Sequence, residues 1–443
     1  MSSMFTNLQG NISLLDPGCG IGSLFVSVIE ESLFRGNENV INITGFDIDE
    51  SLSQELESTA RLCYTRLEGA CNIEIYHKDF LLTDIAEEFT HVILNPPYKK
   101  ISSNSEHRTH LKKSIGLETG NLYSAFLAKA IKQTVKGGEI VAIIPRSFAN
   151  GLYFKAFREF LLSEASIEKI HLFEERNTAF AEDKVLQENI ILHIIKGKKQ
   201  GKVLITSSPS GDFHRDEETN TMTTDGLTQR IVKFEKVVNA NDADKFIHIA
   251  SSVFQQKIID RLSGFTSTLK DIDVEVSTGP VVDFRMKSDL SMNQKSGYNP
   301  LIYPLHLKNG IDWPIEGAKK PNSIKLSDKS KSYLWENKGF YLLTKRFSSK
   351  EEKRRIVATI YDSSPNGELV GFENKLNVFH RNKKGLNHDL IKGLYIYLNS
   401  SLLDQYYRIF SGNTQVNATD LRALHYPSTV SYTHLTLPTI LLV

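Results

Sequence analysis

Cysteine and long apolar runs are scarce in this sequence, and each scarcity excludes a class of protein. The three cysteines, Cys19, Cys63 and Cys71, form no CxxC pair and have no histidines at zinc-ligand spacing, so we expect reduced thiols and no metal site. No segment approaches the roughly 18 to 20 consecutive apolar residues that span a bilayer, and the first ten residues lack a signal-peptide pattern. We therefore expect a cytoplasmic protein with no membrane partner.

An excess of charge of either sign is also missing. The 53 Lys and Arg residues almost balance the 52 Asp and Glu residues, which gives a formal net charge of +1. Any contact with nucleic acid must then come from local basic patches, because bulk charge supplies no attraction. The length of 443 residues is too great for one compact core and predicts two domains.

What is present, from residue 12 to about 196, is an alternation of short apolar runs with amphipathic stretches. The expected strands cover residues 12–16, 41–47, 73–79, 91–97, 139–145, 167–173 and 188–197, and the expected helices cover 22–34, 51–67, 122–135 and 152–162. The last two strands have no helix between them. The pattern predicts a Rossmann-like α/β sheet that is mostly parallel and ends in an antiparallel hairpin.

The composition also predicts where the domains divide. We assign 1–200 to the α/β domain, 201–245, which is rich in Ser, Thr and Asp, to a hinge that can contain a strand or two, and 246–430 to a separate α+β domain. The first strand follows Met1 so closely that no helix fits before it, and the composition changes abruptly after HYPSTV. We therefore expect a fragment whose first domain is incomplete at the N-terminus and whose residues 431–443 are a non-native tail.

The first chemical motif is a glycine-rich loop, DPGCGIG, between the first expected strand and helix. Gly18, Gly20 and Gly22 let the backbone approach a ligand closely. A dinucleotide site would show GxGxxG, whereas this loop has GxGxG after Asp16. S-adenosylmethionine has no phosphate, and its ammonium and sulfonium groups favour a nearby carboxylate. The loop predicts this cofactor, with an ordinary capped turn as the alternative.

Acidic residues at the ends of the next two strands complete the expected cofactor site. Asp47 can hold the two hydroxyls of a ribose, whereas Asp49 is expected to cap the following helix. Asp79 can accept a hydrogen bond from the amine of the cofactor's adenine. Phe80 can lie on the adenine ring, with packing in the core as the competing interpretation.

The second chemical motif is Asn95-Pro96-Pro97-Tyr98, at the end of the fourth expected strand. An aromatic exocyclic amine is a poor nucleophile because its lone pair is delocalised into the ring. The side-chain oxygen of Asn95 and the carbonyl of Pro96 can accept hydrogen bonds from its two N–H groups. The tandem prolines fix the backbone that carries these two acceptors. The motif predicts methyl transfer to such an amine by positioning, with no strong base.

A base inside a duplex is out of reach of this chemistry, so the target base must be flipped out. Tyr98 is expected on one face of the base and Phe180, from the loop between the last two strands, on the other. The segment after Tyr98 is expected to be a long polar loop with cations for the flanking phosphates, a solvated surface being the alternative for any single one. These cations are Lys99, Lys100, Arg108, Lys112 and Lys113.

With these motifs, the chain resembles the adenine-N6-specific DNA methyltransferases of type II restriction-modification systems. The resemblance implies that 16–22 is the cofactor loop, that Asp47, Asp79 and Phe80 contact the cofactor, and that Asn95 to Tyr98 is the catalytic motif. It implies double-stranded DNA as substrate and a cognate restriction endonuclease as partner. Three segments resemble the family's target-recognition domain: 344–358, which includes the DNA-contact candidates Lys345 and Arg346, 374–381 and 411–427.

The resemblance also implies one difference between this chain and the members of the family. Family members carry, ahead of the cofactor loop, a helical segment that covers the methionine end of the cofactor, and we expect this segment to be missing here. On physical grounds alone, Asn417-Ala-Thr-Asp420 in the last segment is a helix start.

Three alternatives remain open. NPPY also serves enzymes that methylate the glutamine amide of proteins or the guanine amine of ribosomal RNA, but those enzymes lack a large C-terminal domain. Enzymes that methylate the cytosine amine usually begin the motif with Ser where this chain has Asn95. A non-catalytic DNA-binding subunit has no physical reason to keep Asp16, Asn95 and Tyr98 together.

Overall fold

The computed structural model describes residues 1–428 apart from 67–70, 175–187, 349–350, 364–366 and 413. The chain forms two compact units, Met1–Val253 and Phe254–Val443. Within the described part of the chain, no helix has the length and apolar character needed to cross a bilayer.

The first unit is built on a nine-stranded sheet with the order β11-β8-β6-β7-β5-β4-β1-β2-β3. Neighbours among β1 to β5 pair in parallel, and β7 runs antiparallel between β5 and β6. The predicted Rossmann-like sheet with its antiparallel terminal hairpin is therefore confirmed. The strands are β1 (Ile12–Pro17), β2 (Ile41–Phe46), β3 (Cys71–Tyr76), β4 (Phe89–Leu94), β5 (Thr134–Pro145), β6 (Ala165–Phe173), β7 (Asn189–Lys196), β8 (Val203–Ser208) and β11 (Thr228–Val232).

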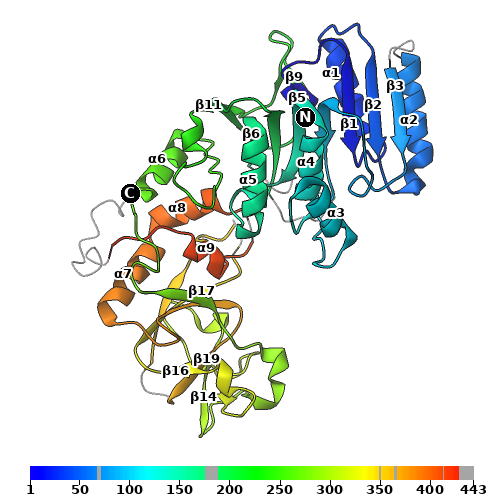
Figure 1. Cartoon of the computed structure of the whole chain (residues 1–443). Coiled ribbons are helices and arrows are strands. Elements are labelled where there is room, and N and C mark those ends of the chain that lie inside the picture. Colours follow the sequence, from blue (N-terminus) through cyan, green and yellow to red (C-terminus); the bar gives the residue numbers. More distant parts are fainter. Residues whose placement is uncertain (67–70, 175–187, 349–350, 364–366, 413, 429–443) are drawn as a thin grey trace. The chain divides into compact units, whose positions relative to one another are not determined.

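Helices cover both faces of this sheet, and the central strands are accordingly apolar on both sides. Leu15 and Leu94 pack with the helices α3, α4 and α5, whereas their neighbours Leu14 and Ile93 pack with α1 and α2. Figure 1 shows α4 and α5 side by side against the sheet. The helices are α1 (Ser23–Phe34), α2 (Ser53–Arg66), α3 (Glu106–Ile115), α4 (Leu122–Lys132) and α5 (Lys155–Glu164).

Residues 201–245, predicted as a hinge that can contain a strand or two, do contain strands, but these strands extend the sheet of the first unit. The prediction of a hinge is therefore wrong. Val203 and Ile205 of β8 are buried, and β8 pairs in parallel with β6. Strand β11 then pairs antiparallel with β8, and a two-stranded ribbon of β9 (His214–Arg215) and β10 (Met222–Thr223) lies between them in sequence. The polar composition reflects the turns and the edge of the sheet.

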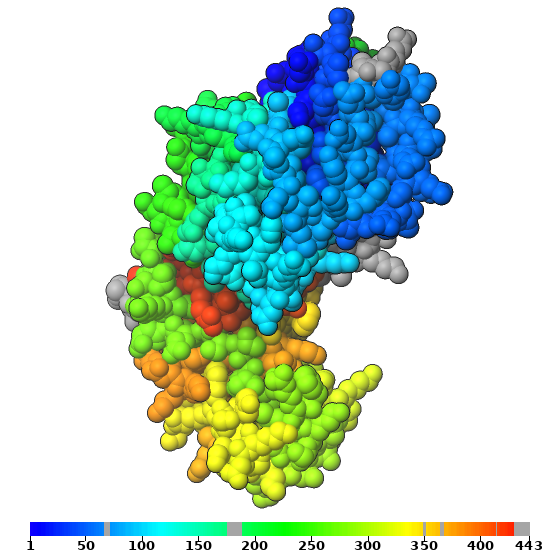
Figure 2. All heavy atoms as spheres, turned by 45° about the vertical axis from the view of Figure 1, so that its right-hand side comes forward, coloured from blue at the N-terminus to red at the C-terminus, as the bar shows by residue number. Residues whose placement is uncertain are grey.

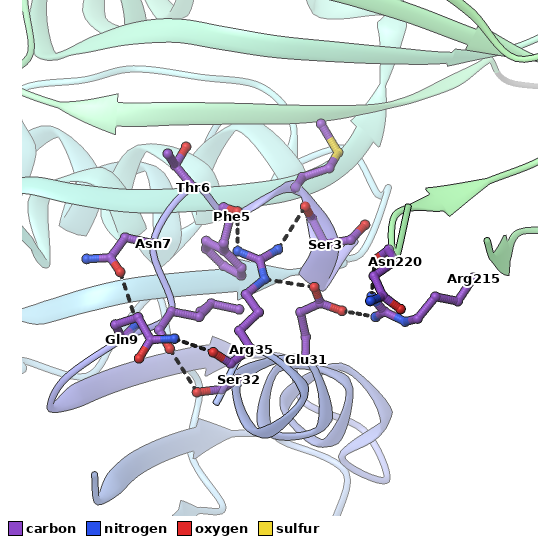
Figure 3. Close-up of polar contacts among 12 residues, drawn as sticks. Ser3, Phe5, Thr6, Asn7, Gln9, Glu31, Ser32, Arg35, Arg215 and Asn220 are labelled. Atoms are coloured by element: carbon purple, nitrogen blue, oxygen red, sulfur yellow. Dashed lines mark hydrogen bonds and ion pairs between the residues drawn. The ribbon is translucent and has the colours of Figure 1, made fainter. Parts of the chain in front are cut away.

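Polar contacts hold the N-terminal segment to the rest of the first unit (Figure 3). The Arg35 guanidinium donates to the carbonyls of Phe5 and Ser3 at 2.8 and 3.1 Å, and it pairs with Glu31 at 2.8 Å. Glu31 also pairs with Arg215 from the ribbon. The end of α1 thereby connects two segments that are far apart in sequence.

A buried carboxylate on the sheet fixes the same segment. Glu139 of β5 accepts from the backbone amides of Thr6 and Asn7 at 2.6 and 2.9 Å and contacts His193 Nε2 at 2.7 Å. Burial raises the pKa of Glu139, but these hydrogen bonds outweigh it and bring the pKa to about 2. The charged carboxylate therefore stabilises the fold at neutral pH.

The second unit contains two antiparallel-rich sheets and several helices. One sheet has the order β12-β20-β17-β18, and the other has the order β13-β15-β14-β19-β16. The strands are β12 (Glu275–Thr278), β13 (Leu290–Ser291), β14 (Tyr298–Ile302), β15 (Ser323–Lys325), β16 (Trp335–Glu336), β17 (Phe340–Lys345), β18 (Ala358–Asp362), β19 (Leu369–Phe372) and β20 (Leu376–His380). The helices are α6 (Val253–Leu262), which begins at the unit boundary, α7 (His388–Leu398), α8 (Ser401–Phe410) and α9 (Ala418–Arg422).

Candidate active site

The glycine-rich loop lies between β1 and α1, as expected. Gly18, Gly20 and Gly22 all adopt positive φ, at 83, 55 and 91°. Gly22 is the N-cap of α1, and a Cβ there would lie 2.4 Å from the ring of Phe25, so only glycine fits. The amides of Gly18 and Cys19 donate to the carbonyl of Phe46 at 2.7 and 2.9 Å, which ties the loop to the end of β2.

Asp16, at the end of β1 and immediately before the glycines of this loop, is a buried acid. Its side chain is fully buried, and neither carboxylate oxygen has a hydrogen-bond partner at good geometry. Burial raises the pKa of Asp16 from 3.8 to about 8; the Phe25 amide lowers it in part, and the charge of Asp47 raises it further. A buried carboxylate without a partner is costly, so this position fits a ligand that carries a cation or a donor.

Asp47 follows β2 and connects the two halves of the site. Its Oδ2 accepts from the amide of Gly20 at 2.8 Å, and its Oδ1 accepts from the amide of Asp49 at 2.9 Å. Asp49 in turn caps the 3₁₀ turn η2 (Glu50–Leu52) ahead of α2 by accepting from Ser51 at 3.0 Å, as expected. Between these two acids, the side chain of Ile48 is 70% exposed.

Asp79 lies three residues beyond β3, in a loop that is held from several sides. Its Oδ1 accepts from the amide of Leu81 at 2.8 Å, and its Oδ2 lies 2.7 Å from His107 Nε2. Lys129 of α4, which is buried, donates to the carbonyls of Phe80, Leu81 and Thr83 at 2.6, 3.3 and 2.5 Å. Burial lowers the pKa of Lys129 to about 8, and nearby acids partly oppose this.

The expectation that Phe80 lies on the cofactor is wrong in this structure. The side chain is 2% exposed and packs against Phe46 and Phe126, at ring-centroid distances of 5.6 and 5.3 Å. Lys129 Nζ lies 5.0 Å from the centroid of the ring. These contacts surround Phe80 inside the core, which is the competing interpretation that the sequence allowed.

The NPPY segment follows β4 at the same end of the sheet as the loop after β1. Asn95 and Pro97 are exposed, Pro96 is buried and Tyr98 is half-buried. The Tyr98 hydroxyl lies 2.9 Å from Asn95 Oδ1 and 3.3 Å from the carbonyl of Ile143. Behind Tyr98, the ring of the buried Tyr123 makes an edge contact at 6.3 Å. The amide of Asn95 therefore faces solvent from a braced backbone.

The segment after Tyr98 was expected to be a long loop, and the structure corrects this with the helix α3. Ser105 caps the helix, the buried Leu111 anchors it, and Gly116 ends it in the left-handed conformation. Arg108 pairs with Glu118 at 3.3 Å, so it is engaged within the protein. The remaining predicted phosphate contacts are exposed: Lys99, Lys100, Lys112 and Lys113.

The other predicted DNA contacts lie in the second unit, where the three segments that resemble a recognition domain meet. Lys345 and Arg346 are half-buried at the end of β17. Arg346 donates to the carbonyl of Asn374 at 2.8 Å, and its own carbonyl accepts from the amide of Val416 at 2.7 Å. Arg346 therefore holds this junction together. The helix start expected at Asn417 is present as the N-terminus of α9.

Two predictions lie outside the described residues. Phe180, the second expected stacking residue, belongs to 175–187, and the expected non-native tail belongs to 429–443.

A cavity of about 770 Å³ lies elsewhere in the first unit. It is lined by the N-terminal segment, the end of α1, strands β6 and β8 and the β9–β10 ribbon, including Met4, Phe34, Lys169 and Phe213. None of the predicted site residues lines it.

Sequence reasoning missed four residues around the site: Ile48, His107, Tyr123 and Lys129. An exposed isoleucine between two acids and a single Lys inside the apolar helix LYSAFLAKAIK were visible signals for Ile48 and Lys129. Ser105 followed by Glu106, with Gly116 after Lys112 and Lys113, is a capped-helix pattern that would have placed His107 on a helix.

Comparison with known proteins gives consistent matches. The family model described as Eco57I restriction-modification methylase matches residues 29–180. Type II methyltransferase M.PstI from Providencia stuartii is 42% identical over 443 residues, which cover 97% of this chain and 84% of that protein. Type II methyltransferase M.BsuBI from Bacillus subtilis is 44% identical over 433 residues, which cover 94% of this chain and 83% of that protein.

Among solved structures, the type IIL restriction-modification enzyme MmeI, determined in complex with DNA, matches with a TM-score of 0.53. The match covers 92% of this chain and 61% of that chain at 15% sequence identity, so it shows a likeness of fold alone.

Proposed function

The chain belongs to the type II restriction-modification methyltransferases, and from this membership we propose that it methylates N6 of a flipped-out adenine in a specific DNA sequence. The observation that carries the proposal is Asn95, an exposed amide at the end of a central strand, beside a fixed Pro-Pro backbone and an aromatic ring. This arrangement suits an exocyclic amine that must be held by two acceptors.

Its cofactor is S-adenosylmethionine, which supplies a methyl group on a sulfonium when bound. The residues present fit this group, because neither oxygen of the buried Asp16 carboxylate has a hydrogen-bond partner of good geometry, and the space around Gly20 in the loop after it is open. Asp16 is available to a cation, Asp47 to ribose hydroxyls and Asp79 to an adenine amine. The exposed Ile48 offers an apolar surface next to Asp47.

The Asn95 side chain and the Pro96 backbone then position the target amine. Asn95 Oδ1 and the Pro96 carbonyl accept hydrogen bonds from the two N–H groups of the amine. These hydrogen bonds localise the lone pair of the nitrogen and direct it towards the methyl group. Tyr98 donates to Asn95 Oδ1 at 2.9 Å here, and the second lone pair of this oxygen can accept from the amine of the base. The ring of Tyr98 is then available for stacking on that base.

We assign the exposed lysines after Tyr98 to the phosphates beside the flipped base. They are Lys99 and Lys100 directly after the motif and Lys112 and Lys113 in the last turn of α3. We assign sequence recognition to the second unit and expect a cognate restriction endonuclease to act at the same sequence. Lys345 is the more available DNA contact there, because Arg346 is engaged.

The competing substrates are cytosine in DNA, the glutamine amide of a protein and the guanine amine of ribosomal RNA. All offer a nitrogen with a delocalised lone pair, so the geometry of Asn95 alone does not separate them. The membership in a restriction-modification family favours DNA, and Asn at position 95 favours adenine.

The proposal is tested by incubating the protein with radiolabelled S-adenosylmethionine and unmethylated duplex DNA, followed by nucleoside analysis. We expect label in N6-methyladenine, and a loss of about 10²- to 10³-fold in the Asn95→Ala variant because one acceptor is removed. Asn104→Ala, an exposed amide nine residues away, is the matched control and should keep full activity. Label in cytosine or in added protein or RNA, or full activity of Asn95→Ala, would contradict the proposal.

A further inference from the structure

We propose that His107 of α3 is a positioning residue for cofactor recognition: it holds the carboxylate of Asp79 so that this group selects an adenine that carries its amine. The inference rests on the proposed function, because it concerns the same cofactor. It assigns a role to a side chain 28 residues away from the acid that it contacts.

The contact itself has the geometry of a directed hydrogen bond. His107 Nε2 lies 2.7 Å from Asp79 Oδ2, and each side chain is 29% exposed. A carboxylate oxygen accepts hydrogen bonds, so the proton of the pair lies on Nε2 of the imidazole. Asp79 Oδ1 is engaged by the amide of Leu81 at 2.8 Å. Two donors, one on each oxygen, therefore fix the orientation of the carboxylate.

The surroundings fix both the backbone of the Asp79 loop and the helix that carries His107, so only the orientation of the Asp79 side chain depends on their contact. Lys129 holds the carbonyls of the residues after Asp79 from inside the core, so the backbone of the loop is fixed. On the other side, Ser105 and Leu111 fix α3, which fixes His107. Removing the imidazole would leave the loop in place and release only the rotation of the Asp79 side chain.

The held carboxylate presents acceptors only. Each oxygen has a second lone pair that is not used by Leu81 or His107, and an exocyclic amine can donate to it. Hypoxanthine carries an oxygen in place of that amine, so two acceptors would face each other. A carboxylate that is held in place should therefore discriminate strongly against the deaminated ring, and a rotating carboxylate should discriminate weakly.

The chain provides a matched control on the same helix. His110 lies one turn after His107 and also faces an acid, but its Nε2 is 3.8 Å from Asp84 Oδ1 and the Asp84 side chain is 95% exposed. Replacing His110 removes an imidazole from α3 without touching Asp79. A difference between the two variants thus reports the Asp79 contact and not the loss of a histidine from the helix.

The test measures equilibrium binding by calorimetry for S-adenosylhomocysteine and for its deaminated analogue, S-inosylhomocysteine, with the full chain. We expect the unmodified protein to prefer the adenine ligand. His107→Ala should lose about tenfold of that preference, mainly through weaker binding of the adenine ligand. His107→Gln should restore most of it, since its amide can donate in place of Nε2, and His110→Ala should match the unmodified protein.

The outcomes separate the two claims. If the unmodified protein binds neither ligand, the proposed cofactor site and this inference both fail. If it prefers the adenine ligand and His107→Ala keeps the full preference, or weakens both ligands equally with no restoration by His107→Gln, only the inference fails. Thermal unfolding of each variant shows whether a loss of binding reflects a loss of fold.

Discussion

Replacing Asp16 by Asn tests the role of a fully buried acid in the cofactor loop region. Neither oxygen of the buried Asp16 side chain has a hydrogen-bond partner of good geometry, and its pKa is raised from 3.8 to about 8, chiefly by burial. Asn has nearly the same size and cannot ionise, so the substitution removes the titration and keeps the packing. The consequences differ between the ligand-free protein and the cofactor complex.

For the ligand-free protein, the raised pKa of Asp16 determines whether stability rises or falls with pH. The folded chain keeps a proton on Asp16 that the unfolded chain has released above pH 3.8. The stability that this group contributes is complete below pH 3.8 and is lost as the pH rises towards 8. The free energy of unfolding of the unmodified protein, relative to Asp16→Asn, should therefore fall by up to about 1.4 kcal/mol per pH unit within this window.

For the complex, a cation next to Asp16 requires the ionised form. At pH 7 only about one Asp16 side chain in ten is ionised in the free protein, so binding should release close to one proton. Calorimetry in two buffers with different ionisation enthalpies measures this release, and Asp16→Asn subtracts the contribution of the ligand's own ammonium. Equal proton release by the two proteins, together with parallel stability profiles from pH 5 to 8, would refute the reasoning.

Two further predictions concern stability. Glu139→Gln should cost about 2 kcal/mol at pH 7, because the charged acceptor for His193 and two backbone amides is lost. The cost should shrink as the pH falls from 4.5 towards 2, where the unmodified protein loses the same charge, so equal losses at pH 7 and pH 3 in urea unfolding would contradict it. Gly45→Ala should cost about 1 to 3 kcal/mol, because its Cβ would lie 2.7 Å from Ile75, whereas Gly201→Ala, with open space around it, should leave the melting temperature unchanged. Equal melting temperatures for these two variants would show that the packing argument fails.

Much of the first unit could be predicted from the sequence because its signals are local. A buried parallel strand is a short apolar run, and the acids and glycines that follow such runs must lie at one edge of the sheet. The positions of Asp16 at the end of β1, and of Asp47 and Asn95 after β2 and β4, follow from this rule. The prediction failed for β8 and β11, since VLITSS and TQRIV are short and polar enough to pass for a linker. Their place in the sheet depends on the pairing of β8 with β6 and of β11 with β8, and a local sequence pattern does not show such pairing.

The side chains around Asp79 also could not be placed from the sequence, because their positions depend on contacts between distant segments. Asp79 and Phe80 are neighbours, and the sequence offered both as cofactor contacts, yet Phe80 turns into the core and only Asp79 faces outward. The loop after a strand end has no fixed period, so the sequence does not tell which of two adjacent side chains is exposed. The contact with His107 requires in addition that a polar segment forms a helix and that this helix lies beside the loop. A motif thus identifies the group that recognises a ligand, whereas the group that orients it is found only when the packing of distant segments is known.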